Sequence, residues 1–307
     1  METVLITGGT GLVGKRLITL LTERGYQIIV LTRNTNQNAE NPLVSFANWD
    51  INNKHIDKEA LSKANYIIHL AGAGVMDKKW TKAYQNEILE SRTKSIELVI
   101  ESLKNINHQV KALISASAIG WYGPDEKANY SFVEDDKPDE NFLGTTCKLW
   151  EASADEAQKL GIRVCKMRIG IVLSDKGGAL SEFMKPLKFG IAGILGNGKQ
   201  NISWIHIEDL CRMFIHAMEN QGMSGSYNAV APYPTSNKTL TLTLARTMKG
   251  AFFIPFYVPS FLLKLMLGKR SIEILKSTKV SSAKISAQGF TFLYPSIEQA
   301  LKNIIKK

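Results

Sequence analysis

The sequence predicts an α/β protein in which a doubly wound parallel sheet is followed by a smaller C-terminal lobe. Two observations lead to this prediction. The chain opens with an apolar run at 3–7, a glycine-dense turn at 8–14 and an amphipathic stretch that stops at Gly25. Further strand-like runs then alternate with helical stretches of roughly 10–20 residues, which is the pattern of repeated βαβ units.

The first of these units predicts a dinucleotide site, because the strand, the glycine turn and the helix follow one another directly and a second strand begins at Gln27. Gly8 allows the tight turn, Gly11 lets the backbone approach a pyrophosphate, and Gly14 lets helix and strand pack closely. The helix N-terminus offers N–H groups to the phosphates. The residues predicted to bind the cofactor here are Gly8, Thr10, Gly11, Leu12, Val13 and Gly14.

The end of the second strand favours NADP(H) over NAD(H). Enzymes that use NAD usually carry an acidic residue at this point for the ribose 2′-hydroxyl, but the sequence here is Thr32-Arg33-Asn34. The Arg33 guanidinium could pair with a 2′-phosphate, or it could be a solvated surface group. Thr32, Arg33 and Asn34 are therefore predicted cofactor residues. Asp50, after a short third strand, could accept a hydrogen bond from the adenine or cap a turn.

Later strands extend the predicted rim of the site, because ligands bind beyond the carboxyl ends of parallel strands. Strand-like runs are found at 66–70, 110–115 and 163–169. The rim residues predicted from these strands are Leu70, Ala71, Gly72, Ala73, Ser115 and Arg168. We predict a nucleotide-binding domain over 1–175, with segments up to about 235 forming the substrate side, and a small helical and loop lobe over 236–307.

Bulk composition narrows the function classes. The 307 residues carry 38 Lys and Arg against 28 Asp and Glu, a net charge of +10. These charges are scattered, which favours attraction of an anionic cofactor or substrate over nucleic-acid binding. The cysteines Cys147, Cys165 and Cys211 are widely spaced and lack metal-ligand spacing, so we expect no metal and a reducing compartment. A strand that begins by residue 3 leaves no room for a signal peptide, which predicts a cytoplasmic protein.

One apolar stretch, 252–267, stands out in the second half of the chain. Pro255, Pro259 and Lys264 interrupt it, so we expect no transmembrane segment. We predict instead a buried segment of the C-terminal lobe or a subunit contact, as in a homodimer. Docking on a membrane surface is the alternative, because the stretch is amphipathic and its end carries a lysine.

Several motifs together resemble the extended and atypical short-chain dehydrogenase/reductases, and more narrowly a family often labelled nucleoside-diphosphate-sugar epimerase. Trp-Ile-His at 204–206 and Asn-Ala-Val-Ala-Pro at 228–232 make the resemblance specific, and it covers essentially the whole chain. It implies a Rossmann-like domain, an NADP-type cofactor and a C-terminal lobe of unknown role. The matching stretches are 6–11, 69–73, 90–92, 114–123, 148–151, 168–173, 203–209, 227–232 and 253–290.

The resemblance also exposes a departure in the expected catalytic residues. Active members of the superfamily carry a Tyr and a Lys four residues apart on one helix, and a Ser at the end of the preceding strand. Here Lys148 stands at the start of a predicted helix, where the resemblance implies that it holds the nicotinamide ribose. Four residues earlier the chain has Gly144 instead of Tyr, so the usual general acid is missing.

Three residues are candidate substitutes for the missing Tyr. Tyr122 could reach the substrate or pack as a loop aromatic. Cys147 could have its thiol pKa lowered by the neighbouring Lys148, or be a small buried residue. Ser117 could bind a substrate hydroxyl or carbonyl, or cap a turn. The predicted catalytic residues are Ser117, Tyr122, Cys147 and Lys148.

Two function classes follow from these residues. The first is an NADP-dependent oxidoreductase or epimerase that acts on a small hydroxyl or carbonyl substrate, nucleotide sugars included. The second is a catalytically reduced NADP(H)-binding protein that regulates a partner or senses redox state.

Overall fold

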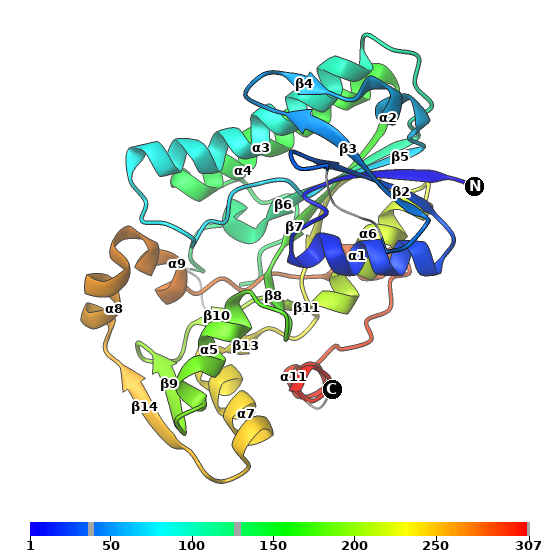
Figure 1. Ribbon diagram of the computed structural model, residues 1–307. Helices are drawn as coiled ribbons and strands as arrows, with labels where there is room; N and C mark the ends of the chain where they lie inside the picture. Colours follow the sequence, from blue (N-terminus) through cyan, green and yellow to red (C-terminus); the bar gives the residue numbers. More distant parts are fainter. Residues whose placement is uncertain (36–39, 126–129, 306–307) are drawn as a thin grey trace.

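The computed structural model describes residues 1–35, 40–125 and 130–305, and in this part of the chain its largest element is an eight-stranded sheet (Figure 1). Neighbouring strands are parallel, except for the antiparallel pair at one edge. In spatial order the strands are β12 (Gly225–Ala229), β7 (Arg163–Ile169), β6 (Ala112–Ala118), β5 (Tyr66–His69), β1 (Thr3–Thr7), β2 (Gln27–Thr32), β3 (Val44–Asp50) and β4 (His55–Ile56). The predicted doubly wound α/β fold is confirmed.

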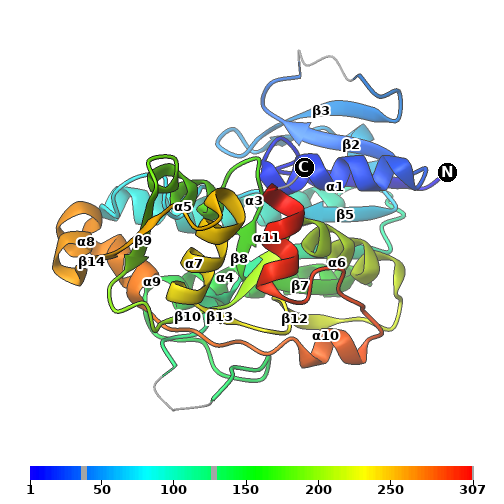
Figure 2. The same cartoon turned by 90° about the horizontal axis from the view of Figure 1, so that it is seen from below.

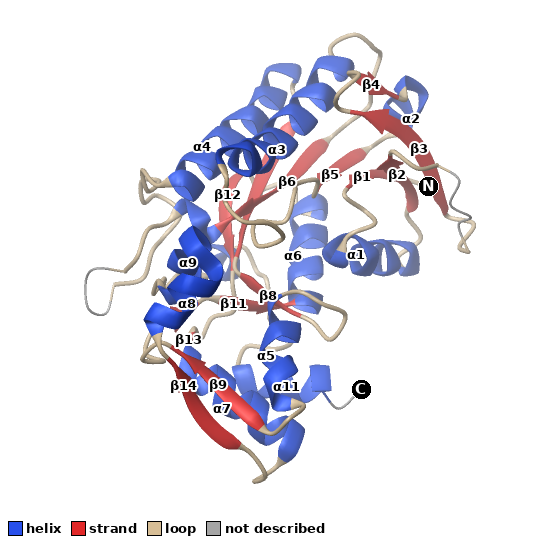
Figure 3. Cartoon of the chain, turned by 60° about the vertical axis from the view of Figure 1, so that its left-hand side comes forward, coloured by secondary structure: helices blue, strands red, loops and turns tan. Residues whose placement is uncertain are grey.

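Helices cover both faces of this sheet, as Figures 1 and 3 show. The helices are α1 (Leu12–Glu23) and α6 (Ile207–Glu219) on one face, and α2 (Lys58–Lys63), α3 (Lys82–Leu103) and α4 (Phe142–Asp155) on the other. Each layer has its own apolar core: Leu17, Leu21 and Phe214 belong to the first, and Leu61 and Ile96 to the second. Central strands are therefore buried on both sides, and this is why β1 reads as a continuous apolar run.

The register brings the carboxyl ends of the central strands together. Thr7 at the end of β1 lies opposite Leu31 in β2 and His69 in β5. Its hydroxyl oxygen also accepts hydrogen bonds from the backbone N–H groups of Leu70 and Ala71, both at 3.2 Å. The turn after β1 and the loop after β5 thus form one continuous edge.

A second apolar core follows β7, in which Leu180 and Trp204 pack with Leu244 and Leu301. The segments predicted to form the substrate side thus share this core with the C-terminal lobe, and the predicted boundaries stay a prediction. The elements around this core, which we call the second lobe, are β8 (Ile171–Leu173), α5 (Ala179–Leu187), β9 (Ile191–Leu195), β10 (Asn201–Ile202), β11 (Trp204–His206), β13 (Thr235–Ser236), α7 (Asn237–Lys249), β14 (Ile254–Val258), α8 (Ser260–Leu267), α9 (Ser271–Leu275) and α11 (Ile297–Ile305).

Short connecting elements complete the fold. The 3₁₀ turns are η1 (Ile119–Trp121), η2 (Glu156–Leu160) and η3 (Gly268–Arg270), and the remaining helix is α10 (Ala283–Ala287). Between α9 and α11 the chain returns to the apolar core that α1 and α6 form on the sheet, where Ile285 and Phe290 are buried. The last part of the chain therefore serves both lobes.

The apolar stretch at 252–267 is exposed, so the prediction that it is a buried segment of the lobe is wrong. Phe252 is 86% exposed, Phe261 72% and Leu265 80%. The segment forms β14, which pairs in parallel with β9, and then α8, and both lie at one end of the molecule (Figure 2). Within the described residues no helix is long and apolar enough to cross a membrane.

Candidate functional site

The first part of the site is the turn 8–14 together with the loop Leu70–Ala73, which we call the glycine edge. Gly8 has a φ of +69°, and a Cβ there would lie 2.8 Å from the carbonyl carbon of Leu70. Gly14 is as constrained, because its Cβ would lie 2.6 Å from the Cα of Gly9. Both glycines are thus required by the turn and by helix–strand packing.

Gly11 differs, because no neighbouring protein group requires a glycine there. Its backbone is extended, with φ −77° and ψ 177°, a conformation open to any residue. A Cβ would meet only the Gly8 carbonyl oxygen, at 3.3 Å, among the described residues. Gly11 also begins α1 without a side-chain cap, whereas Asp57, Thr81 and Asn141 cap α2, α3 and α4. The open space and the uncapped N-terminus both suit an anionic ligand.

The exposed Arg33 stands where the sequence predicts contact with a 2′-phosphate, just after β2. Asp50 ends the neighbouring β3, but its carboxylate accepts hydrogen bonds from Asn52 and Asn53. The hydrogen bonds from Asn53 first, and Arg33 to a smaller extent, lower the pKa of Asp50. Asp50 therefore caps its own turn, and its predicted adenine contact stays a prediction.

Contacts with α3 hold the loop Leu70–Ala73 in place. The Ala73 N–H donates to Ser91 Oγ at 2.9 Å, and a Cβ on Gly72 would lie 3.1 Å from the Arg92 guanidinium carbon. His69 at the end of β5 is fully buried, and burial lowers its pKa to about 3. His69 is therefore neutral at physiological pH and packs in the core beneath the glycine edge.

The second part of the site is a group of polar side chains that we call the Glu151 cluster. Ser117, Tyr122, Glu151, Arg168 and Asn228 are buried in it, and Ser226 is half-buried. Glu151 Oε1 accepts from Arg168 Nε at 2.8 Å and from Ser117 Oγ at 2.7 Å. Its other oxygen accepts from Arg168 Nη2 at 3.0 Å and from Ser226 Oγ at 2.8 Å. Ser117 and Arg168, both predicted site residues, are thus engaged with protein partners.

Tyr122 is equally enclosed in this cluster. It is fully buried, donates to Asn228 Oδ1 at 2.7 Å and accepts from Arg168 Nη1 at 2.9 Å. Burial raises its pKa to about 12, so it keeps its proton at neutral pH. The guanidinium of Arg168 also lies 3.7 Å from the centre of the Trp121 ring. Ser115 is buried as well and donates to the Ala116 carbonyl at 2.9 Å.

Helix α4 begins at Phe142, so Lys148 lies in its middle and not at its start. The helix places Cys147 on its buried face and Lys148 on its exposed face. Cys147 is 4% exposed, with its sulfur 3.6 Å from the Ala118 carbonyl oxygen. Burial, and then Glu151, raise the pKa of this thiol to about 12, the opposite of the direction expected from a neighbouring lysine. The predicted ribose contact of Lys148 stays a prediction.

A Tyr cannot replace Gly144 on this backbone. A Cβ at that position would overlap the carbonyl oxygen of Asp139, in the turn that leads into α4. The usual Tyr–Lys pair is therefore excluded by the path of the chain as well as by the residue present.

Comparison with known proteins shows the family to which the chain belongs. A model of the NAD dependent epimerase/dehydratase family matches residues 4–229. The chain belongs to this family. A model of a domain of unknown function matches residues 258–304, within the second lobe. Epimerase family proteins of Staphylococcus aureus and Staphylococcus saprophyticus are 36% and 34% identical to it, over 100% and 99% of this chain and 100% of their own lengths.

Solved structures of the epimerase family have the same fold. A human epimerase family protein, SDR39U1, crystallised with NADPH, is 28% identical over 99% of both chains, with a TM-score of 0.84. A nucleoside-diphosphate sugar epimerase from Corynebacterium glutamicum is 30% identical, with a TM-score of 0.77 over 99% of this chain and 58% of its own. The protein is thus an NAD(P)-binding, epimerase-like protein.

Sequence reasoning missed Glu151 and the partners of β12, Ser226 and Asn228. Glu151 is buried four residues after Cys147 on the same helix face. A carboxylate on the apolar face of a helix, near a buried-strand arginine such as Arg168, was the available signal. Asn228 stood in the motif 228–232 that carries the family resemblance, but nothing in the sequence linked it or Ser226 to Tyr122 and Glu151.

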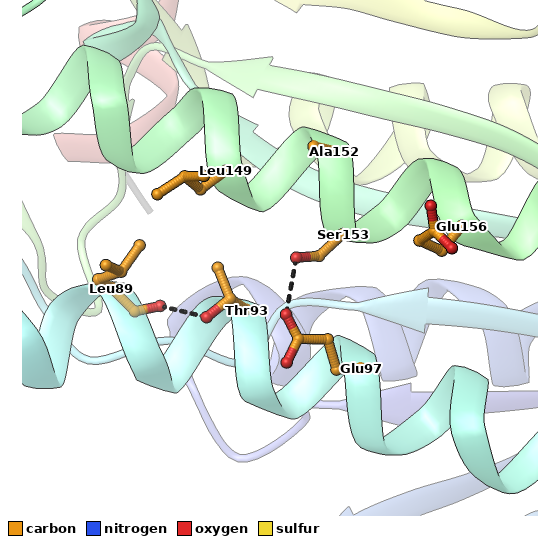
Figure 4. Close-up of a pocket in the computed structure, with 7 residues that line it drawn as sticks. All are labelled: Leu89, Thr93, Glu97, Leu149, Ala152, Ser153 and Glu156. Atoms are coloured by element: carbon orange, nitrogen blue, oxygen red, sulfur yellow. Dashed lines mark hydrogen bonds between the residues drawn. The ribbon is translucent and has the colours of Figure 1, made fainter.

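A shallow groove on the outer side of α4 is separate from both parts of the epimerase-family site (Figure 4). It runs between α3 and α4, where Ser153 Oγ donates to Glu97 Oε1 at 3.0 Å. The residues that line it are Leu89, Thr93, Glu97, Leu149, Ala152, Ser153 and Glu156. The groove lies on the exposed side of the helix, turned away from Ser117.

Proposed function

We propose that this protein binds NADP(H) in preference to NAD(H), and that it acts as an oxidoreductase or epimerase on a small substrate with a hydroxyl or carbonyl group, nucleotide sugars included. The observation that carries the cofactor preference is the exposed Arg33 beside an Asp50 whose two carboxylate oxygens are engaged in its own turn. No free acid competes at this end of β2, so a 2′-phosphate has a cation and a 2′-hydroxyl lacks its usual acceptor.

The glycine edge has the groups that would hold the rest of the cofactor. The N-terminus of α1 and the open space at Gly11 suit the pyrophosphate, and the loop Leu70–Ala73 lies beside them. When bound, the dinucleotide supplies a hydride donor or acceptor. Tyr122 and Cys147 are both buried, and the Tyr122 hydroxyl already donates to Asn228. Proton exchange during turnover would therefore fall to water or to a group of the substrate.

The closed Glu151 cluster favours a second candidate, an NADP(H)-binding regulatory or redox-sensing protein. Ser117 donates to Glu151, and Tyr122 bridges Asn228 and Arg168. None of these side chains is free to act on a substrate in this arrangement. A protein that only reports the state of its cofactor needs the glycine edge and no acid or base beside it.

Calorimetry with NADPH and NADH tests the cofactor preference. We expect the unmodified protein to bind NADPH more tightly, and Arg33→Ala to narrow the preference about tenfold or more, since a lost charge-assisted pair costs roughly 1.5–3 kcal/mol. Arg24→Ala is the matched control, because Arg24 is an exposed arginine at the opposite end of α1. Equal affinity of the unmodified protein for both cofactors would overturn the proposed preference.

A turnover assay separates the two candidate functions. NADPH oxidation is followed with sugar nucleotides, aldehydes, ketones and quinones as substrates. Turnover of any of them supports the enzyme. Tight NADPH binding without turnover across the whole panel favours the regulatory protein.

A further inference from the structure

An exposed apolar protrusion lies at the end of the second lobe. We define it as residues 189–191 and 252–267, which comprise the start of β9, all of β14 and all of α8 (Figures 1 and 3). Phe189 is 85% exposed, Phe252 86% and Leu265 80%. Other large exposed side chains of the protrusion are Ile191, Ile254, Phe256, Tyr257, Phe261 and Met266. Side chains of this size rarely gather on a surface that faces only water.

The charge around this protrusion is predominantly positive, and the acids that border it in α5 and α9, Glu182 and Glu273, each pair with a lysine. The chain contains 28 Asp and Glu, yet the segments 183–207 and 220–272 contain none. The same segments carry nine basic residues: Lys185, Lys188, Lys199, Lys238, Arg246, Lys249, Lys264, Lys269 and Arg270. Of these, Lys188, Lys264 and Lys269 are exposed on or beside the protrusion. An apolar surface bordered mainly by cations complements an anionic surface with an apolar interior.

Two other occupants fit this composition less well. Protein–protein interfaces are enriched in arginine and depleted in lysine, whereas seven of the nine basic residues here are lysines. A second copy of the chain would bring the same positive surface against itself, because a twofold contact pairs identical patches. Both arguments favour a partner that is not a protein.

We propose that the protrusion docks on the surface of a membrane that contains anionic lipids. Phe252, Phe261 and Leu265 enter the headgroup region, and the lysines beside them contact lipid phosphates. Just beyond the protrusion, Arg270 Nη1 in η3 donates to the Met76 carbonyl at 2.7 Å, which ties this end of the lobe to the loop after β5. The proposal does not depend on which cofactor binds.

Vesicle sedimentation tests the docking. We expect the full-length protein to sediment with phosphatidylcholine vesicles that contain about a third phosphatidylglycerol, to bind pure phosphatidylcholine vesicles much less, and to be released by high salt. Absence of binding to the anionic vesicles would overturn the proposal.

Two double variants locate the binding surface. Phe252→Ser with Phe261→Ser, and separately Lys264→Glu with Lys269→Glu, should each lower vesicle partitioning by about tenfold or more. The controls are Leu293→Ser, an apolar residue that is 52% exposed outside the protrusion, and Lys58→Glu with Lys82→Glu on two other exposed helix ends. The substituted side chains are exposed, so melting temperatures should stay close to that of the unmodified protein.

The remaining outcomes contradict the proposal. Control variants that lose as much binding as the protrusion variants would assign the effect to net charge or to another surface. Sedimentation velocity covers the second-copy alternative. If the unmodified protein is a dimer, the Phe252/Phe261 variant is a monomer and neither binds vesicles, the protrusion is an interface between copies.

Discussion

The glycine edge and the Glu151 cluster lie at the carboxyl ends of strands in the same sheet, yet their polar groups differ in whether protein partners satisfy them. At the glycine edge, the start of α1 has no side-chain cap, and a Cβ on Gly11 would have one close neighbour among the described residues, the Gly8 carbonyl oxygen. In the Glu151 cluster, Glu151 alone accepts four hydrogen bonds from Ser117, Ser226 and Arg168. Both regions lie at the same edge of the sheet, but only the glycine edge has hydrogen-bonding groups available to a ligand.

The largest expected effect breaks the Glu151 cluster. Glu151→Ala should lower the free energy of unfolding by about 3–5 kcal/mol, because it leaves the buried Arg168 guanidinium without its carboxylate. Chemical denaturation measures this loss. The control is Glu156→Ala just beyond the same helix, whose solvent-exposed pair with Lys159 should be worth less than about 1 kcal/mol. A similar small loss for both variants would mean that the cluster does not hold the structure together.

The next effect concerns the glycine edge. Gly11→Val should raise the Kd for NADPH by about a hundredfold or more, because the new side chain fills the space left for the pyrophosphate. The backbone angles at this position suit any residue, and the close contact of the new Cβ is with the Gly8 carbonyl oxygen at 3.3 Å. The melting temperature without cofactor should therefore fall, but by less than about 3 °C.

Gly14→Ala gives the contrast for that experiment. Its Cβ would meet the Gly9 backbone, so it should destabilise the protein by about 1–3 kcal/mol. If Gly11→Val binds NADPH normally, the turn is structural throughout and the difference between the two glycines disappears.

A smaller effect tests whether Tyr122 is structural. Tyr122→Phe should lower the free energy of unfolding by about 1 kcal/mol, since it removes the hydroxyl between Asn228 and Arg168. The Kd for NADPH, measured by calorimetry, should stay unchanged. Loss of turnover without loss of stability would instead assign Tyr122 to catalysis and contradict the closed state of the cluster.

The smallest expected effect is that of Lys148→Ala. Lys148 lies on the exposed side of α4, where a ligand can reach it, so loss of its predicted ribose contact should raise the Kd for NADPH by about fivefold. Lys159→Ala, an exposed lysine just beyond the same helix, serves as the reference. An unchanged Kd for Lys148→Ala would contradict the ribose contact that the sequence resemblance implies.

Local patterns in the sequence predicted the parallel sheet and the glycine turn. Strand, turn and helix follow one another within residues 3–23, so nearest neighbours determine them. The Glu151 cluster was not predictable in this way, because Glu151 and Ser226 meet only when β12 pairs with β7. A contact between residues so far apart in the chain leaves no trace in local periodicity.

The second lobe shows the same limit. Its core brings Leu180 and Leu301 together, although they lie far apart in the chain. An apolar run such as 252–267 has the same sequence pattern whether the folded chain buries it or leaves it exposed. Hydrophobicity predicted burial there, whereas the folded chain leaves Phe252 and Leu265 outside.

The contact between Gly144 and Asp139 has an evolutionary consequence. A Tyr restored at position 144 would collide with the turn before α4, and such overpacking costs stability before any chemistry is gained. The step from this chain to a member with a Tyr–Lys pair therefore cannot be taken by a single substitution. The turn and the residue have to change together, so selection acting one mutation at a time meets a barrier between the two kinds of protein.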